Sequence, residues 1–87
     1  MREIVFSDNF VSSVKNLDRV IAVKINNGLA LLQKNAFHPK LHTKPLRGKL
    51  TGFYSFRVGR DYRVIFKFLQ NKNIFLISAE HRSKVYK

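Results

Sequence analysis

The 87-residue sequence contains no cysteine, which excludes a disulfide framework, a cysteine-ligated zinc site and a catalytic thiol. It also has no apolar signal region and no hydrophobic run long enough to span a bilayer, so we expect a cytoplasmic protein with no membrane partner. The glycines at positions 48, 52 and 59 do not fit a nucleotide-binding motif, and we expect no cofactor. His38 and His42 have the spacing of metal ligands, but Pro39 breaks the helix that would align them, so we expect no metal site.

Acidic residues are scarce: the chain has 5 Asp+Glu against 17 Lys+Arg, a formal net charge of +12. The excess is uneven, since residues 1–43 carry a net charge of +3 and residues 44–87 carry +9. Hydrophobic residues make up 45% of the chain and include eight Phe, which indicates a folded domain and not a basic tail. Such a domain most often binds a polyanion, either nucleic acid or an acidic protein. The alternative is a basic surface that serves only solubility.

The first third of the sequence predicts a short strand, Glu3–Ser7, followed by two helices. Ser7 or Asp8 is the candidate cap of the first helix, and Asp18 is the candidate cap of the second. Gly28 inside the second helix costs about 1 kcal/mol relative to Ala, and we attribute it to close approach of the first helix in a helical hairpin. The apolar positions at helical spacing are Phe10, Val14 and Leu17 in the first helix, and Ile21, Ile25, Leu29 and Leu32 in the second.

The rest of the chain predicts a loop over residues 38–52 and then three strands, with a last segment too short for an independent helix. The order βααβββ predicts one α+β domain, residues 1–87, with the helical hairpin packed on one face of a mainly antiparallel sheet. The three predicted strands are Phe53–Val58, Tyr62–Leu69 and Ile74–Ala79.

The hairpin "GFYSFRVGRDYRVIF" places two arginines opposite each other. A three-residue loop over residues 59–61 pairs apolar positions with apolar positions, whereas a two-residue loop mixes the two faces. The three-residue loop also pairs Arg57 with Arg63, which destabilises a sheet unless an anion lies between them. The pair is therefore a candidate phosphate clamp. Two alternatives are that Asp61 or Glu80 neutralises it, or that both guanidinium groups point into water.

The terminal segment "EHRSKVY" follows the last predicted strand directly, so its side chains can fold back beside the arginines. His81 is a candidate acid or base, because histidine titrates near neutral pH. Arg82 adds a cation, and Tyr86 can stack on a base or orient a group through its hydroxyl. Together with Arg57 and Arg63, these residues have the composition of an RNA-cleaving site.

The patterns "L.G...G.Y..R...YR..F" and "HR...VY" resemble the RelE/ParE superfamily of bacterial toxin–antitoxin toxins over nearly the whole chain. The resemblance implies the fold predicted above. It also implies a metal-independent endoribonuclease of the RelE-like branch, which cleaves mRNA in the ribosomal A site and thereby inhibits translation. Its expected partners are mRNA, ribosomal RNA and an acidic cognate antitoxin. ParE-type members share the fold and inhibit DNA gyrase instead.

The resemblance also suggests roles for single residues. Arg63 matches the arginine that contacts the scissile phosphate, and Tyr86 matches the terminal catalytic tyrosine. Arg57 stands where RelE has one lysine, Ser55 stands where RelE has the lysine proposed as base, and Glu80 falls near the position of the arginine proposed as acid. The general base is therefore open, and relatives with a C-terminal histidine favour His81 as a proton carrier.

Two other functions remain open at this point: a ParE-like gyrase inhibitor, and a basic RNA-binding module without activity. His81 and Tyr86 favour the nuclease, since an inhibitor that only binds does not need them. The predicted catalytic residues are Arg57, Arg63, His81, Arg82 and Tyr86, and the predicted RNA-binding residues are Lys44, Arg47, Lys49, Arg60, Lys67 and Lys72.

Overall fold

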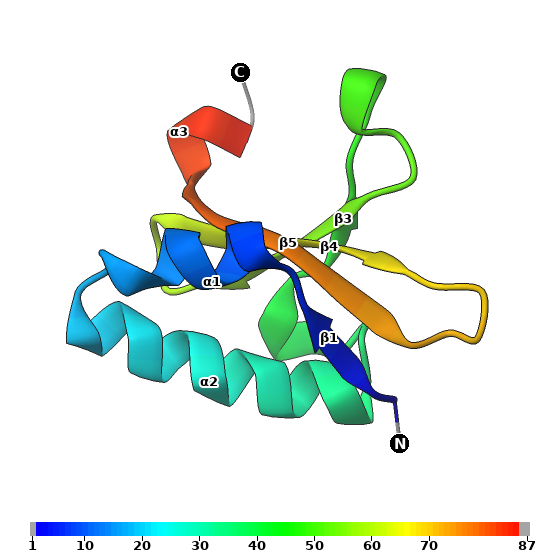
Figure 1. Cartoon of the computed structure of the whole chain (residues 1–87), viewed down its shortest axis with the longest axis horizontal. Helices are drawn as coiled ribbons and strands as arrows, with labels where there is room; N and C mark the ends of the chain where they lie inside the picture. The colour runs from blue at the N-terminus through cyan, green and yellow to red at the C-terminus, as the bar shows by residue number, and fades with distance from the viewer. Residues whose placement is uncertain (1, 86–87) are drawn as a thin grey trace.

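The computed structural model describes residues 2–85, which form a mixed five-stranded sheet with two helices on one face (Figure 1). The strand order is β1-β5-β4-β3-β2, with β1 parallel to β5 and the other neighbours antiparallel. No helix in this part of the chain is long and apolar enough to cross a membrane. The elements are β1 (Ile4–Phe6), α1 (Asp8–Lys15), α2 (Arg19–Lys34), η1 (Pro39–Leu41), β2 (Lys44–Pro45), η2 (Gly48–Leu50), β3 (Tyr54–Val58), β4 (Tyr62–Phe68), β5 (Ile74–His81) and α3 (Arg82–Val85).

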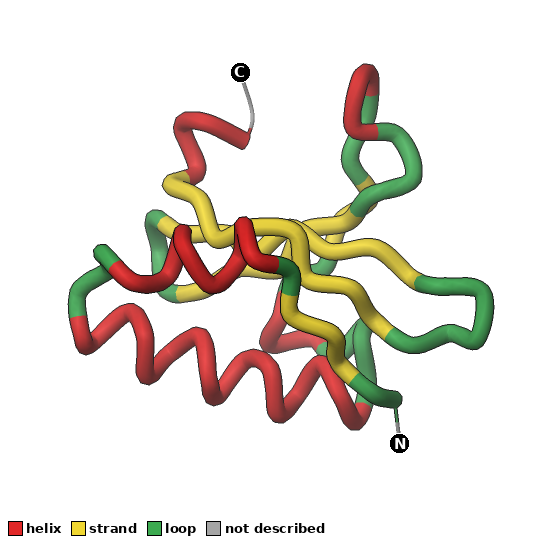
Figure 2. Tube along the Cα trace, viewed as in Figure 1, coloured by secondary structure: helices red, strands yellow, loops and turns green. Residues whose placement is uncertain are grey.

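The predicted α+β fold is confirmed, including the helical pair on one face of a mainly antiparallel sheet (Figure 2). Ser7 caps α1, because its Oγ accepts a hydrogen bond of 2.9 Å from the backbone N–H of Phe10. Asp18 precedes α2 as predicted, but its side chain makes no capping hydrogen bond. The start of α2 therefore depends on packing more than on its cap.

The prediction of a plain loop over residues 38–52 is wrong in part. This segment contains two 3₁₀ turns, η1 and η2, and between them the short strand β2. Lys44 of β2 pairs with Ser55 of β3, and Pro45 pairs with Tyr54, so the sheet gains an edge strand. A proline is tolerated there because an edge strand need not donate every backbone N–H to a neighbour.

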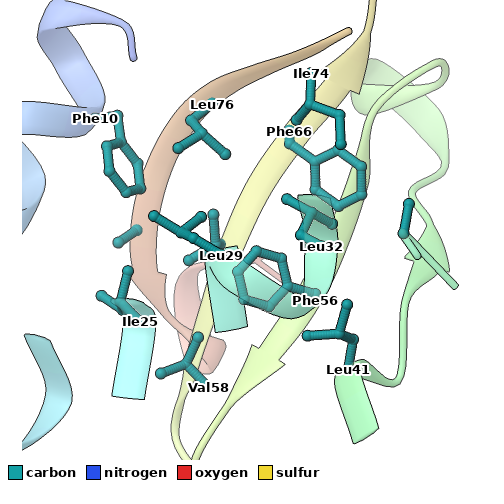
Figure 3. Packing of buried hydrophobic residues seen from close by; sticks show 13 residues of the cluster. Phe10, Ile25, Leu29, Leu32, Leu41, Phe56, Val58, Phe66, Ile74 and Leu76 are labelled. Carbon is teal, nitrogen blue, oxygen red and sulfur yellow. The ribbon is translucent and has the colours of Figure 1, made fainter. Parts of the chain in front are cut away.

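One apolar face of the sheet is buried under α1 and α2, and it forms the core of the domain (Figure 3). Phe56, Val64 and Phe66 project from β3 and β4 and are fully buried against Leu29 and Leu32 of α2. The alternation of strand side chains places these apolar positions on one face and leaves the intervening positions for the other.

Gly28 is explained by the sheet and not by the first helix. A Cβ atom at this position would lie 2.7 Å from Cε1 of Phe56, which is too close for real atoms. The expectation that α1 demanded this glycine is therefore wrong. The missing side chain lets α2 approach β3, and Phe56 fills the space.

Candidate active site

The second face of the sheet carries polar and basic side chains, and it lies opposite α2 (Figure 1). The turn of α3 and the η2 segment project from this side at two separate places. We call it the arginine face. From the strand registers, its members are the polar or charged residues Lys44, Ser55, Arg57, Arg63, Lys67, Ser78 and Glu80 and the apolar residues Val5, Ile65 and Phe75.

The predicted register of the first hairpin is confirmed. Val58 pairs with Tyr62, Phe56 with Val64 and Tyr54 with Phe66 across a three-residue loop. Arg57 therefore lies directly opposite Arg63.

The two arginines differ in exposure. Arg57 is exposed, whereas Arg63 is only 7% exposed, so the expectation of an open position is wrong for Arg63. Nη1 of Arg63 donates hydrogen bonds to the backbone carbonyl oxygens of Tyr62, at 2.8 Å, and Arg60, at 3.1 Å. These contacts hold the Arg63 side chain against the β3–β4 turn and fix one member of the pair in place.

Glu80 extends the arginine pair into a row across three strands. It lies opposite Arg63 on β5, just as Arg57 lies opposite Arg63 on β3. From β3 to β5, the row consists of the cations Arg57 and Arg63 and then the carboxylate of Glu80. Glu80 is half-buried. Of the two acidic residues considered as neutralising partners, Glu80 is the one that the sheet places in this row.

A β-bulge in β5 determines which side chains join the row. Phe66 pairs with Leu76, but the preceding residue Ile65 pairs with Ser78, so Ile77 is an extra residue on β5. Without the bulge, the alternation that points Leu76 into the core would point His81 toward the arginine face. The bulge reverses this alternation, so Glu80 faces the arginines and His81 faces the opposite side.

Side chains of α1 and its cap bind β5 around the bulge. The carbonyl oxygen of Ile77 accepts hydrogen bonds from Oγ of Ser7, at 3.1 Å, and from Nδ2 of Asn9, at 3.0 Å. Oγ of Ser13 accepts a hydrogen bond of 2.9 Å from the backbone N–H of Ala79. These contacts provide partners for β5 backbone groups that lie beyond the residues paired with β1, and they tie α1 to the strand at the bulge.

His81 therefore does not lie on the arginine face, contrary to the sequence-based prediction. Its ring meets the ring of Tyr62 edge-on at 5.6 Å, and its Nδ1 lies 2.9 Å from Oγ of Ser83. Nδ1 also accepts a hydrogen bond from the backbone N–H of Ser83 at 3.2 Å. His81 and Glu80 nevertheless line one hollow of about 320 Å³ at the edge of β5.

Arg82 is held by the β3–β4 turn. Its backbone N–H donates to the carbonyl oxygen of Asp61 at 2.7 Å, and its Nε lies 3.6 Å from the Asp61 carboxylate. Both side chains are about half exposed, so this ion pair contributes little to stability. It does fix where α3 leaves the sheet. The predicted catalytic Tyr86 follows α3 and lies outside the described residues.

The predicted RNA-binding residues fall into three groups. Lys44 lies on the arginine face through its pairing with Ser55, so its assignment to a loop is wrong. Lys67 lies on the same face, but its Nζ stands over the rings of Phe53 and Phe75, at 5.9 and 5.7 Å from their centroids. The remaining four are exposed: Arg47 and Lys49 at η2, Arg60 in the β3–β4 turn and Lys72 in the β4–β5 turn.

Comparison with known proteins agrees with this architecture. The family model for the "YoeB-like toxin of bacterial type II toxin-antitoxin system" matches residues 5–82. The chain belongs to this family. A search of curated proteins finds no significant match.

Solved structures of related toxins share the fold. The YoeB/ParE toxin from Agrobacterium tumefaciens is 17% identical, with 92% of this chain and 98% of that chain covered and a TM-score of 0.78. YafQ from E. coli is 21% identical over the full length of both chains, with a TM-score of 0.77. The RelB–RelE antitoxin–toxin complex from Methanococcus jannaschii contains a chain that is 25% identical, with 94% of both chains covered and a TM-score of 0.75. The predicted membership of the RelE/ParE superfamily is confirmed.

Proposed function

We propose that this toxin is an endoribonuclease that cleaves mRNA on the ribosome and thereby inhibits translation. The observation that supports the proposal is the opposed pair of Arg57 and Arg63 on the sheet face that α1 and α2 leave uncovered. Two guanidinium groups at one rung concentrate positive charge on this face, and guanidinium groups bind phosphate oxygens in a bidentate manner.

The two arginines have different roles in the proposed reaction. Arg63 is held by two backbone carbonyls, so it offers a fixed positive charge to the phosphate as negative charge builds in the transition state. Arg57 is exposed and can follow the substrate as it binds. No metal is needed in this scheme, because the arginines supply the charge stabilisation that the phosphate requires.

The neighbouring groups complete the proposed site. His81 lines the hollow together with Glu80, and in this scheme its ring transfers a proton to the leaving 5′-oxygen. Arg82 and Tyr86 position the RNA, and Lys44 adds positive charge to the arginine face. Exposed Arg47, Lys49, Arg60 and Lys72 attract RNA phosphates at long range, as does the partly covered Lys67.

We further propose that an acidic antitoxin neutralises the toxin in a complex. Solved relatives are described as toxin–antitoxin complexes, among them the RelB–RelE complex from Methanococcus jannaschii and the YoeB–YefM complex from Staphylococcus aureus. A chain with a net charge of +12 attracts an acidic segment strongly, and a disordered segment can fold onto such a surface.

The test is expression of the toxin alone and together with the neighbouring gene in a bacterial host. We expect growth arrest with the toxin alone and normal growth with both genes. Purified toxin should cleave mRNA on programmed ribosomes and leave the supercoiling activity of DNA gyrase unchanged. Inhibition of gyrase without RNA cleavage would replace the nuclease with the ParE-like alternative, and normal growth with verified soluble protein would contradict the toxin proposal itself.

A further inference from the structure

The bulge at Ile77 places a carboxylate beside the two arginines. Without the extra residue, Glu80 would face the core side of the sheet, and Ala79 would lie opposite Arg63. The polar contacts from Ser7, Asn9 and Ser13 show that α1 is built to hold this irregular strand. Bulges are over-represented next to active sites, where they change the direction of a side chain.

We propose that Glu80 is the general base of the cleavage reaction, an inference that rests on the proposed nuclease function. Glu80 is the one acidic residue among residues 2–85 that the strand registers place in the row of Arg57 and Arg63. In this assignment the 3′-phosphate of a nucleotide binds at Arg57 and Arg63, and its 2′-hydroxyl lies on the β5 side of Arg63, where Glu80 follows in the row. Its half-burial limits its hydration and favours transfer of a proton from a bound hydroxyl.

The reaction balances with the groups present. The Glu80 carboxylate takes the proton of the 2′-hydroxyl while the 2′-oxygen forms a bond to phosphorus. The bond between phosphorus and the 5′-oxygen breaks, and its electron pair stays on that oxygen. His81 donates from Nε2 the proton that the 5′-oxygen takes up; this step needs an imidazolium, in which Nδ1–H donates to Oγ of Ser83 in place of accepting from the Ser83 N–H. The products are a 2′,3′-cyclic phosphate and a 5′-hydroxyl, and no oxidant or further reactant is required.

Several charged or titratable groups surround Glu80. Arg63 lies opposite Glu80 on β4, and Arg57 follows on β3. At the hollow on the edge of β5, the groups of this kind that line it with Glu80 are Tyr62, His81 and Lys84. Ser13 of α1 and Leu17, which follows that helix, also line the hollow and carry no charge.

The experiment compares Glu80→Gln with the wild type in single-turnover cleavage of mRNA on programmed ribosomes across a range of pH. We expect the variant to be slower by roughly 100-fold or more, which is the usual effect of losing a general base. The acidic limb of the pH–rate profile should disappear, because Gln cannot be protonated in that range. Glu80→Asp should restore part of the rate, and Glu80→Ala should be partly rescued by added formate.

Glu3→Gln is the matched control. It makes the same change of charge at an exposed residue just before β1, so it should cleave at the wild-type rate. Thermal melts of each variant establish that the fold is intact. Cleavage by folded Glu80→Gln at the wild-type rate, or with an unchanged pH profile, would overturn the assignment.

A binding measurement separates this inference from the proposed nuclease function. The wild type should bind a short RNA oligonucleotide more tightly than its 2′-deoxy counterpart, because Glu80 accepts a hydrogen bond from the 2′-hydroxyl, and Glu80→Ala should lose the preference. If the wild type cleaves no RNA but shows this preference, the nuclease proposal fails and the placement of Glu80 stands. If the wild type binds both oligonucleotides equally well, the assignment of Glu80 is wrong whether or not the toxin cleaves.

Discussion

The two faces of the sheet have opposite chemistry although the same strands form both. On the face under α1 and α2, Phe56, Val64 and Phe66 are fully buried, and the packing is close enough to require Gly28. On the arginine face, charged side chains line up across β3, β4 and β5. The difference shows that one face stabilises the domain, while the other keeps an arrangement of charges that stability alone does not favour.

Phe56→Ala has the largest expected effect on the helix-covered face. Phe56 is 0% exposed and packs against Phe66 with a ring-centroid distance of 6.1 Å. Its truncation leaves a cavity that α2 cannot fill, and we expect the free energy of unfolding to fall by about 3–5 kcal/mol. Urea denaturation measures this loss. A loss well below 1 kcal/mol would mean that this face is not the main core. The contrast drawn between the helix-covered face and the arginine face would then be wrong.

His81→Gln should slow the reaction without unfolding the protein. Loss of a proton donor costs roughly 100-fold in single-turnover rate, and any part of the pH–rate profile that depends on His81 should disappear. His81 is exposed, so thermal melts should change little. Because His81 lines the hollow and pairs with Tyr62, off the arginine face, an unaltered rate would restrict the site to the row of Arg57, Arg63 and Glu80.

Gly28→Ala tests the close approach of α2 to β3. The new methyl group would meet Phe56 at 2.7 Å, and overpacking of this kind costs about 1–3 kcal/mol. Because Ala favours a helix over Gly by about 1 kcal/mol, we expect a net loss near 1 kcal/mol. Asn27→Ala is the control, since Asn27 is exposed on the same helix and should not destabilise it. Stabilisation by Gly28→Ala would show that Phe56 moves aside at no cost.

Lys49→Ala should have the smallest effect. This lysine is exposed at η2, so it should act through long-range attraction to RNA phosphates. Its loss should weaken RNA binding and lower the slope of log affinity against log salt by about one unit. Lys34→Ala removes the same charge from the end of α2 and should leave the slope unchanged. A selective loss of cleavage with unchanged binding would place Lys49 among the catalytic groups.

Much of the fold could be predicted because apolar alternation is strong where strands pack under helices. Pairing the apolar residues Phe56 and Val64 on the core face fixes the register of β3 and β4. In that register Arg57 lies opposite Arg63. The strand β2 was missed because Lys44 and Pro45 carry no alternation and no β propensity. Pairing with β3 creates that strand.

The site was predicted less completely than the fold, and the bulge is the reason. Regular alternation from Leu76 places His81 on the arginine face, but the extra residue Ile77 reverses it and brings Glu80 there. The sequence contains one indication of the bulge: the core residues Leu76 and Ala79 are three positions apart, whereas regular alternation requires an even spacing. Nothing in the sequence indicates that Arg63 is buried, because its side chain is held by backbone carbonyl groups at the turn.

The most direct test of the account is single-turnover cleavage of mRNA on programmed ribosomes by Arg63→Ala. Arg63 donates two hydrogen bonds to backbone carbonyls, so we expect the variant to lose about 1–3 kcal/mol of stability but to remain folded. Its cleavage rate should fall by roughly 100- to 1000-fold, because a fixed cation that stabilises the transition state is gone. Cleavage by the folded variant at the wild-type rate would contradict the account, because the arginine pair would then have no part in the chemistry.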